Sequence, residues 1–272
     1  MDAALSKNGA RLLRAFFALV VVFLYAPILI LLIFSFNNSQ LPSFPLSGFT
    51  LHWYHQFLTN ADLRAALETS TTVAALSSIV AVALGILASV ALVRKNFRGK
   101  SPVTALLLSP LVIPYVVLGV SLLLLFQTVG INRSIFTVMI GHIVLSLPYT
   151  ILVLMPRLQQ IDVGLEEAAY DLGASRLRTF RSIVFPLILP AVVSAYLIAF
   201  TTSFDEYAVA SFVVGPTRIT FPVYLYSALR FPNNLPQVIA VAVVVMIVSL
   251  IVVVGAEIGR RIAERRLGAL DV

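Results

Sequence analysis

Long apolar segments alternate with short polar segments along the whole chain. A helix that crosses a bilayer needs about 18 apolar residues, and several of the apolar runs are longer than this. Six spans are predicted, over residues 15–36, 69–93, 103–126, 135–155, 187–207 and 236–259. The pattern therefore predicts an all-α integral membrane protein, in which residues 1–272 form a single transmembrane domain.

The composition supports this class and excludes several others. Of the 272 residues, 60% are hydrophobic and only 11% are charged, which is far more apolar surface than a water-soluble domain needs. The chain has no cysteine, so it has no disulfide, no thiol nucleophile and no cysteine-bound metal. His52 and His55 lie three residues apart, but no third or fourth ligand is near them, and we predict no metal site.

The basic residues predict how the chain is oriented. Fifteen of its 19 lysines and arginines fall in alternate polar segments: Lys7, Arg11, Arg14, Arg94, Lys95, Arg98, Lys100, Arg157, Arg176, Arg178, Arg181, Arg260, Arg261, Arg265 and Arg266. Cytoplasmic segments of membrane proteins carry an excess of Lys and Arg. Both termini and the segment 161–186 are therefore expected in the cytoplasm.

The segment 161–186 is a long polar interval between two strongly apolar blocks, and it carries much of the chain's charge. Asp162 can cap a first short helix, Gly173 can end it, and Ser175 can cap a second helix. In the first helix, one amphipathic stripe is expected to hold Leu165, Ala168, Ala169 and Leu172. Such a helix is typical either of an element that docks on another protein or of an ordinary solvated loop.

The same segment resembles a known motif. Its matching positions are Glu167-Ala168-Ala169, Gly173, Ile183 and Phe185-Pro186. This spacing is similar to the EAA loop of bacterial ABC-importer permeases, with Phe185 in place of the usual leucine. The resemblance implies a type I ABC-importer permease fold and a loop that docks on the ATP-hydrolysing subunit. It assigns ATPase coupling to Glu166, Glu167, Ala168, Ala169, Asp171, Gly173, Ser175 and Pro186.

Three further segments resemble the PotC-type permeases of spermidine/putrescine importers. They are residues 48–54, 96–100 and 203–216. The resemblance implies a permease for polyamines or a related small cationic nitrogenous solute. Opines and aminophosphonates, which are assigned to other members of that subfamily, are the alternative substrates.

Two adjacent carboxylates stand near the outer end of the fifth predicted span. Asp205 and Glu206 are costly there unless they face a wet cavity or a partner. A cavity with negative charge favours a cationic solute, and Phe204 and Tyr207 offer cation–π contact. We therefore predict a substrate pathway at Phe204, Asp205, Glu206 and Tyr207; the alternative is that the span ends earlier and both carboxylates lie in outside water.

The chain lacks the motifs that an energy source or a catalyst needs. It has no G-x-x-x-x-G-K-[ST] phosphate loop and no evident catalytic triad, so we predict neither an enzyme nor a cofactor in this chain. The resemblance implies a companion permease, a pair of ATPase subunits that bind ATP and Mg²⁺, and a periplasmic solute-binding protein, at the bacterial inner membrane. A secondary transporter or channel, which needs no ATPase, is the alternative function, and a membrane-embedded enzyme comes third.

Overall fold

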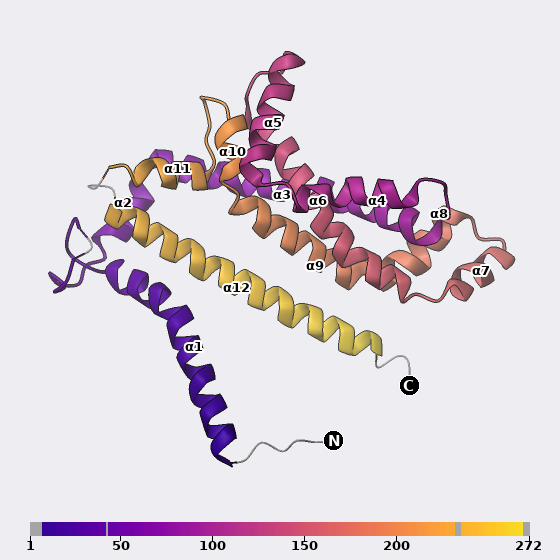
Figure 1. Ribbon diagram of the computed structural model, residues 1–272, viewed down its shortest axis with the longest axis horizontal. Helices are drawn as coiled ribbons and strands as arrows, with labels where there is room; N and C mark the ends of the chain where they lie inside the picture. Colours follow the sequence, from indigo (N-terminus) through magenta and orange to yellow (C-terminus); the bar gives the residue numbers. More distant parts are fainter. Residues whose placement is uncertain (1–6, 42, 232–234, 269–272) are drawn as a thin grey trace. The chain divides into compact units, whose positions relative to one another are not determined.

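The computed structural model describes residues 7–41, 43–231 and 235–268, and these residues fold into helices (Figure 1). The predicted domain also includes residues 1–6 and 269–272, which lie outside the described residues. The side chains of Lys7 and of the basic residues from Arg260 onward lie outside them as well. The chain divides into two units, Met1–Ala61 with Ser227–Val248, and Asp62–Tyr226 with Ser249–Val272.

The first unit contains one long apolar helix and a short one. Helix α1 covers Lys7–Phe34, and α2 covers His52–Thr59. The segment between them is fastened by the Trp53 indole, whose Nε1 donates to the Asn37 carbonyl at 2.9 Å. Helix α12 begins in this unit, at Leu235, and ends at Gly268.

The second unit holds the elements that position both predicted sites. Its helices are α3 (Ala61–Arg94), α4 (Lys100–Leu108), α5 (Tyr115–Thr128), α6 (Ile135–Gln159), α7 (Val163–Asp171), α8 (Arg176–Thr179), α9 (Phe185–Phe204), α10 (Ala208–Val213) and α11 (Phe221–Ala228). Helices α6 and α9 lie side by side (Figure 1), and α10 packs against α5 and α6. Of the four residues of the predicted solute pathway, Glu206 is buried in this unit.

Helix α3 approaches α6 closely. A side chain at Gly85 would collide with Thr150 of α6, so the small glycine is required at this contact. Thr150 also donates its hydroxyl to the Ala81 carbonyl at 3.2 Å. The middle of α3 is thus held firmly against α6.

Five helices in the described residues are long and apolar enough to cross a membrane, and a bent pair raises the number to six. The bent pair corresponds to the predicted span 103–126, and its two helices do not form one continuous helix. Residues Lys100–Leu111 and Tyr115–Thr128 meet at an angle of 106°. Pro114 stands at the break, where its missing N–H cannot continue the helical hydrogen bonds.

The fifth predicted span begins earlier than the sequence suggested. Helix α8, a π-helical turn (Phe180–Val184) and α9 follow one another without interruption, so the helical run covers Arg176–Phe204 instead of 187–207. The π turn ends two residues before Pro186, which has no N–H to donate to the helix. The part of the loop that carries Arg176, Arg178 and Arg181 is therefore continuous with the helix of the fifth span.

The segment after the fifth span is not a simple loop. Helix α10 lies within it, and Val209, Ala210 and Val213 are fully buried against apolar side chains of α5 and α6. The six residues of α10 are too few to show a helical period in the sequence. Burial against partners distant in the sequence produces this helix.

Candidate functional site

The loop between α6 and α9 has the local structure that its sequence predicts. The Asp162 carboxylate accepts the Gly164 N–H at 2.9 Å and caps α7. Gly173 follows the end of α7 with a φ of +81°, a conformation that glycine adopts without strain. Ser175 accepts the Arg178 N–H at 3.4 Å and caps α8. The predicted helix, break and second helix are confirmed.

One side of α7 faces its own chain. Ala169 is buried, and Glu166 forms an ion pair with Arg94, the last residue of α3, with Nε and Oε1 2.7 Å apart. Ile161, at the start of the loop, packs with Leu158, Val184 and Ile188 in an apolar cluster and so fixes this end of the loop. Of the predicted coupling residues, Glu166 and Ala169 therefore hold the helix in place.

The other side of α7 is open. Glu167, Ala168 and Asp171 are exposed, and Leu172 has 89% of its surface exposed. Leu165 is 48% exposed, and Leu177 of α8 is 76% exposed. Of the predicted amphipathic stripe, only Ala169 is buried, so the rest of that stripe does not serve the chain's own core.

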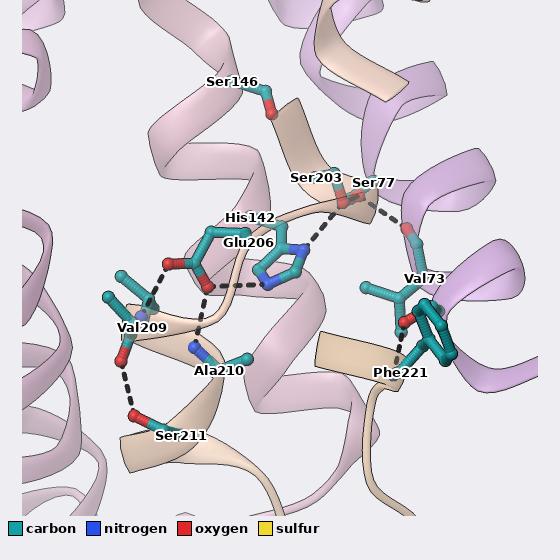
Figure 2. A network of polar contacts seen from close by, with 12 residues as sticks. Val73, Ser77, His142, Ser146, Ser203, Glu206, Val209, Ala210, Ser211 and Phe221 are labelled. Atoms are coloured by element: carbon teal, nitrogen blue, oxygen red, sulfur yellow. Dashed lines mark hydrogen bonds and ion pairs between the residues drawn. The ribbon is translucent and has the colours of Figure 1, made fainter. Parts of the chain in front are cut away.

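The second predicted site lies where α9 ends, and Figure 2 shows it. Glu206 is buried, and its two carboxylate oxygens accept the N–H groups of Val209 at 2.7 Å and Ala210 at 2.9 Å (Figure 2). The carboxylate thus caps α10, where the positive end of the helix dipole favours an anion. His142 of α6 lies beside it, with Nε2 3.4 Å from Glu206 Oε2.

The polar network continues from His142 to α3. His142 Nδ1 and the Ser203 hydroxyl are 2.7 Å apart, and Ser203 Oγ lies 3.1 Å from Ser77 Oγ (Figure 2). All of these side chains are buried. Side chains of α3, α6 and α9 are therefore joined to the start of α10 by one chain of polar contacts.

Asp205 differs from its neighbour because it is exposed. It follows the last residue of α9, and its side chain is free of the contacts that hold Glu206. Phe204 stacks on Phe200 at a centroid distance of 5.9 Å and contacts Phe221 at 6.3 Å. Tyr207 contacts Tyr226 at 4.6 Å. The four predicted pathway residues are close together, but their environments divide them into one buried cap and three partly or fully exposed side chains.

Sequence reasoning missed the partners of Glu206. His142, Ser203 and Ser77 lie on three helices, and no spacing in the sequence relates them. The sequence does predict that His142, a lone ionisable residue within a span, bonds across helices, and its contact with Ser203 of α9 confirms this. In the described residues no group of three or more His, Asp or Glu side chains is arranged to hold a metal ion.

The comparisons with known proteins agree with this architecture. Residues 81–267 match the family described as binding-protein-dependent transport system inner membrane component. The spermidine/putrescine transport system permease protein PotC of Escherichia coli K12 is 37% identical over 249 residues, which cover 91% of this chain and 94% of that protein. The putrescine transport system permease protein PotI of the same organism is 38% identical over 231 residues, 82% of each chain.

Two solved structures share the fold. A chain of a bacterial ABC transporter involved in the import of the acidic polysaccharide alginate matches with a TM-score of 0.73 and 17% identity, over 93% of this chain and 94% of that one. A chain of the MetNI methionine ABC transporter in an inward-facing conformation matches with a TM-score of 0.58 and 20% identity, over 75% and 95%. The resemblance found in the sequence is confirmed, and the chain, a multi-pass membrane protein, belongs to the family of inner membrane components of binding-protein-dependent transport systems.

Proposed function

We propose that this chain is a permease subunit of an ATP-driven ABC importer for polyamines or a related small cationic nitrogenous solute. It crosses the bacterial inner membrane six times, if the bent pair α4–α5 counts as one span, and both termini lie in the cytoplasm. The distribution of basic residues supports this orientation. The similarity to the PotC and PotI permeases supports the solute class.

The observation that carries the proposal is the open side of α7. Leu165, Leu172 and Leu177 expose apolar surface within a segment that also carries seven charged side chains. An apolar patch rimmed by charges at a water-facing position is typical of a protein interface. We infer that an ATP-hydrolysing subunit covers it, with Glu167 in polar contact and Ala168 allowing close approach.

The remaining partners follow from what the chain lacks. The ATP and Mg²⁺ are bound by a pair of partner ATPase subunits, because no phosphate loop exists here. A companion permease completes the pathway, and a periplasmic solute-binding protein delivers the solute. This chain is therefore a conducting subunit and not an enzyme.

Near the outer end of α9, the solute meets Asp205. Asp205 is exposed and lies between Phe204 and Tyr207 in the sequence, and a carboxylate with aromatic rings near it suits an ammonium group. Glu206 contributes by fixing the turn between α9 and α10 rather than by touching the solute, since its oxygens already accept two backbone N–H groups. ATP-driven closure of the partner subunits exposes this region alternately to the two sides of the membrane.

Co-purification tests the docking assignment. A tagged wild-type chain is expected to retain the ATPase subunit, whereas Glu167→Lys and Gly173→Asp are expected to lose it. Glu68→Lys, a charge reversal at an exposed residue of α3, is the matched control and keeps the subunit. Retention by both loop variants, or ATP-independent uptake of putrescine by the chain alone, would support a secondary transporter instead.

A further inference from the structure

Helix α3 touches both candidate sites. Its last residue, Arg94, contacts the loop of residues 161–186, which is called the docking loop below. Ser77, 17 residues earlier in α3, belongs to the buried polar network beside Glu206. At 1.5 Å per residue the two positions are about 25 Å apart along the helix. Another α3 residue, Ser70, accepts the Phe221 N–H at 2.8 Å, so α3 also contacts the start of α11.

Arg94 binds the docking loop at two points. Its Nε lies 2.7 Å from Glu166 Oε1, and its Nη2 donates to the Ile161 carbonyl at 3.3 Å. The Arg94 and Glu166 side chains are only 14% and 13% exposed, so solvent screens this ion pair less than it screens an ordinary surface pair. One guanidinium thus ties the beginning of the loop and the body of α7 to the end of α3.

Apolar packing stiffens the same junction. Val90 and Val93 of α3 pack against the cluster of Ile161, Val184 and Ile188. Further along α3, Gly85 lies so close to Thr150 of α6 that an added Cβ would collide with its side chain, so the two helices are in close contact there. Since packed interiors deform little, a displacement applied at Arg94 is carried along the helix instead of being absorbed.

We propose that Arg94 is a positioning residue that couples the docking helix α7 to α3, so that a motion of α7 reaches the Ser77–Ser203 contact beside the solute site. The inference rests on the proposed function, in which a partner ATPase moves α7. It adds a physical link between the two sites, made of one ion pair, one rigid helix and one pair of buried hydroxyl groups.

The test uses the complex that co-purifies with the chain, reconstituted in vesicles with putrescine and spermidine as probes. Arg94→Gln removes the positive charge, and with it the ion pair, and leaves a shorter polar side chain. The complex is expected to assemble and to hydrolyse ATP, but the solute imported per ATP hydrolysed falls about fivefold or more. Lys95→Gln, the exposed neighbour of Arg94, is the control and leaves this ratio unchanged.

The charge-swapped double variant Arg94→Glu with Glu166→Arg separates coupling from folding. It restores the ion pair without the bond to the Ile161 carbonyl, and it is expected to recover most of the lost ratio. Wild-type coupling in Arg94→Gln overturns the inference, and so does loss of assembly in Arg94→Gln that the swap does not repair.

A distance measurement gives a result that does not depend on transport. Spin labels on cysteines introduced at Ala91 of α3 and at Leu172, which directly follows α7, in a chain with no other cysteine, report how firmly the two helices are joined. The distance distribution is expected to broaden in Arg94→Gln, and an unchanged distribution overturns the inference. Absence of ATP-driven uptake in the wild-type complex would refute the proposed function alone.

Discussion

Replacing Glu206 by alanine is expected to destabilise the protein strongly, because this carboxylate is a buried cap. The change leaves the N–H groups of Val209 and Ala210 without acceptors and removes the carboxylate beside His142. Each buried polar group without a partner costs about 1–3 kcal/mol. The two N–H groups alone therefore give a loss of about 2–6 kcal/mol in the free energy of unfolding.

The isosteric change Glu206→Gln should cost about half as much, about 1–3 kcal/mol, because the amide keeps one acceptor oxygen. Asp205→Asn is the matched control, since this neighbouring carboxylate is exposed and caps no helix. Its stability should stay within about 0.5 kcal/mol of wild type, while its uptake of putrescine and spermidine falls. The two positions are thus expected to differ: Glu206 stabilises the fold, and Asp205 takes part in transport.

Thermal unfolding in detergent, followed by the amount of monodisperse protein left after heating, measures these differences. With roughly 2–4 °C per kcal/mol for a chain of this size, a loss of about 2–6 kcal/mol in Glu206→Ala should lower the midpoint by about 4–24 °C. The reasoning is refuted if Glu206→Ala unfolds at the wild-type temperature, or if Asp205→Asn is destabilised as much as Glu206→Ala.

Three further changes test other parts of the structure. Gly85→Leu should cost about 1–3 kcal/mol by overpacking the contact with Thr150, as measured by thermal unfolding, whereas Gly255→Leu, with open space around it, should not. Gly173→Val should cost about 1–2 kcal/mol because valine is strained at a φ of +81°, and it should weaken capture of the ATPase subunit in co-purification; full capture would contradict this. Asp162→Ala should cost about 1 kcal/mol by removing the α7 cap, visible as faster amide exchange within α7, and unchanged exchange would show that the cap is dispensable.

The docking loop was predictable in detail because its signals are local. Caps, a positive-φ glycine and a polar segment between spans depend on neighbouring residues, and each has the conformation that its residue type favours. What the local pattern could not give is the rotation of α7 about its axis. That rotation is set by Arg94, which lies about 70 residues away in the sequence, and it turns Glu166 inward and Glu167 outward.

The buried site was only partly predictable for the same reason. Two adjacent carboxylates at the end of a span indicated a functional region, but the pattern could not distinguish Asp205 from Glu206. Tertiary contacts make the distinction, because α10 folds back and presents two N–H groups to Glu206 alone. Pro114 within the third predicted span indicates a break in the helix, but hydropathy is continuous across it and could not predict that the backbone turns by 106°.

Cysteine labelling at position 168 tests the central claim most directly. Ala168 is exposed on α7, and the chain has no other cysteine, so Ala168→Cys gives a unique label. The proposed function predicts that a membrane-impermeant maleimide reaches this cysteine only from the cytoplasmic side, and that a short crosslinker joins it to the ATP-hydrolysing subunit. Labelling from the outside of intact cells, or crosslinks that never reach an ATPase, would contradict the proposed function.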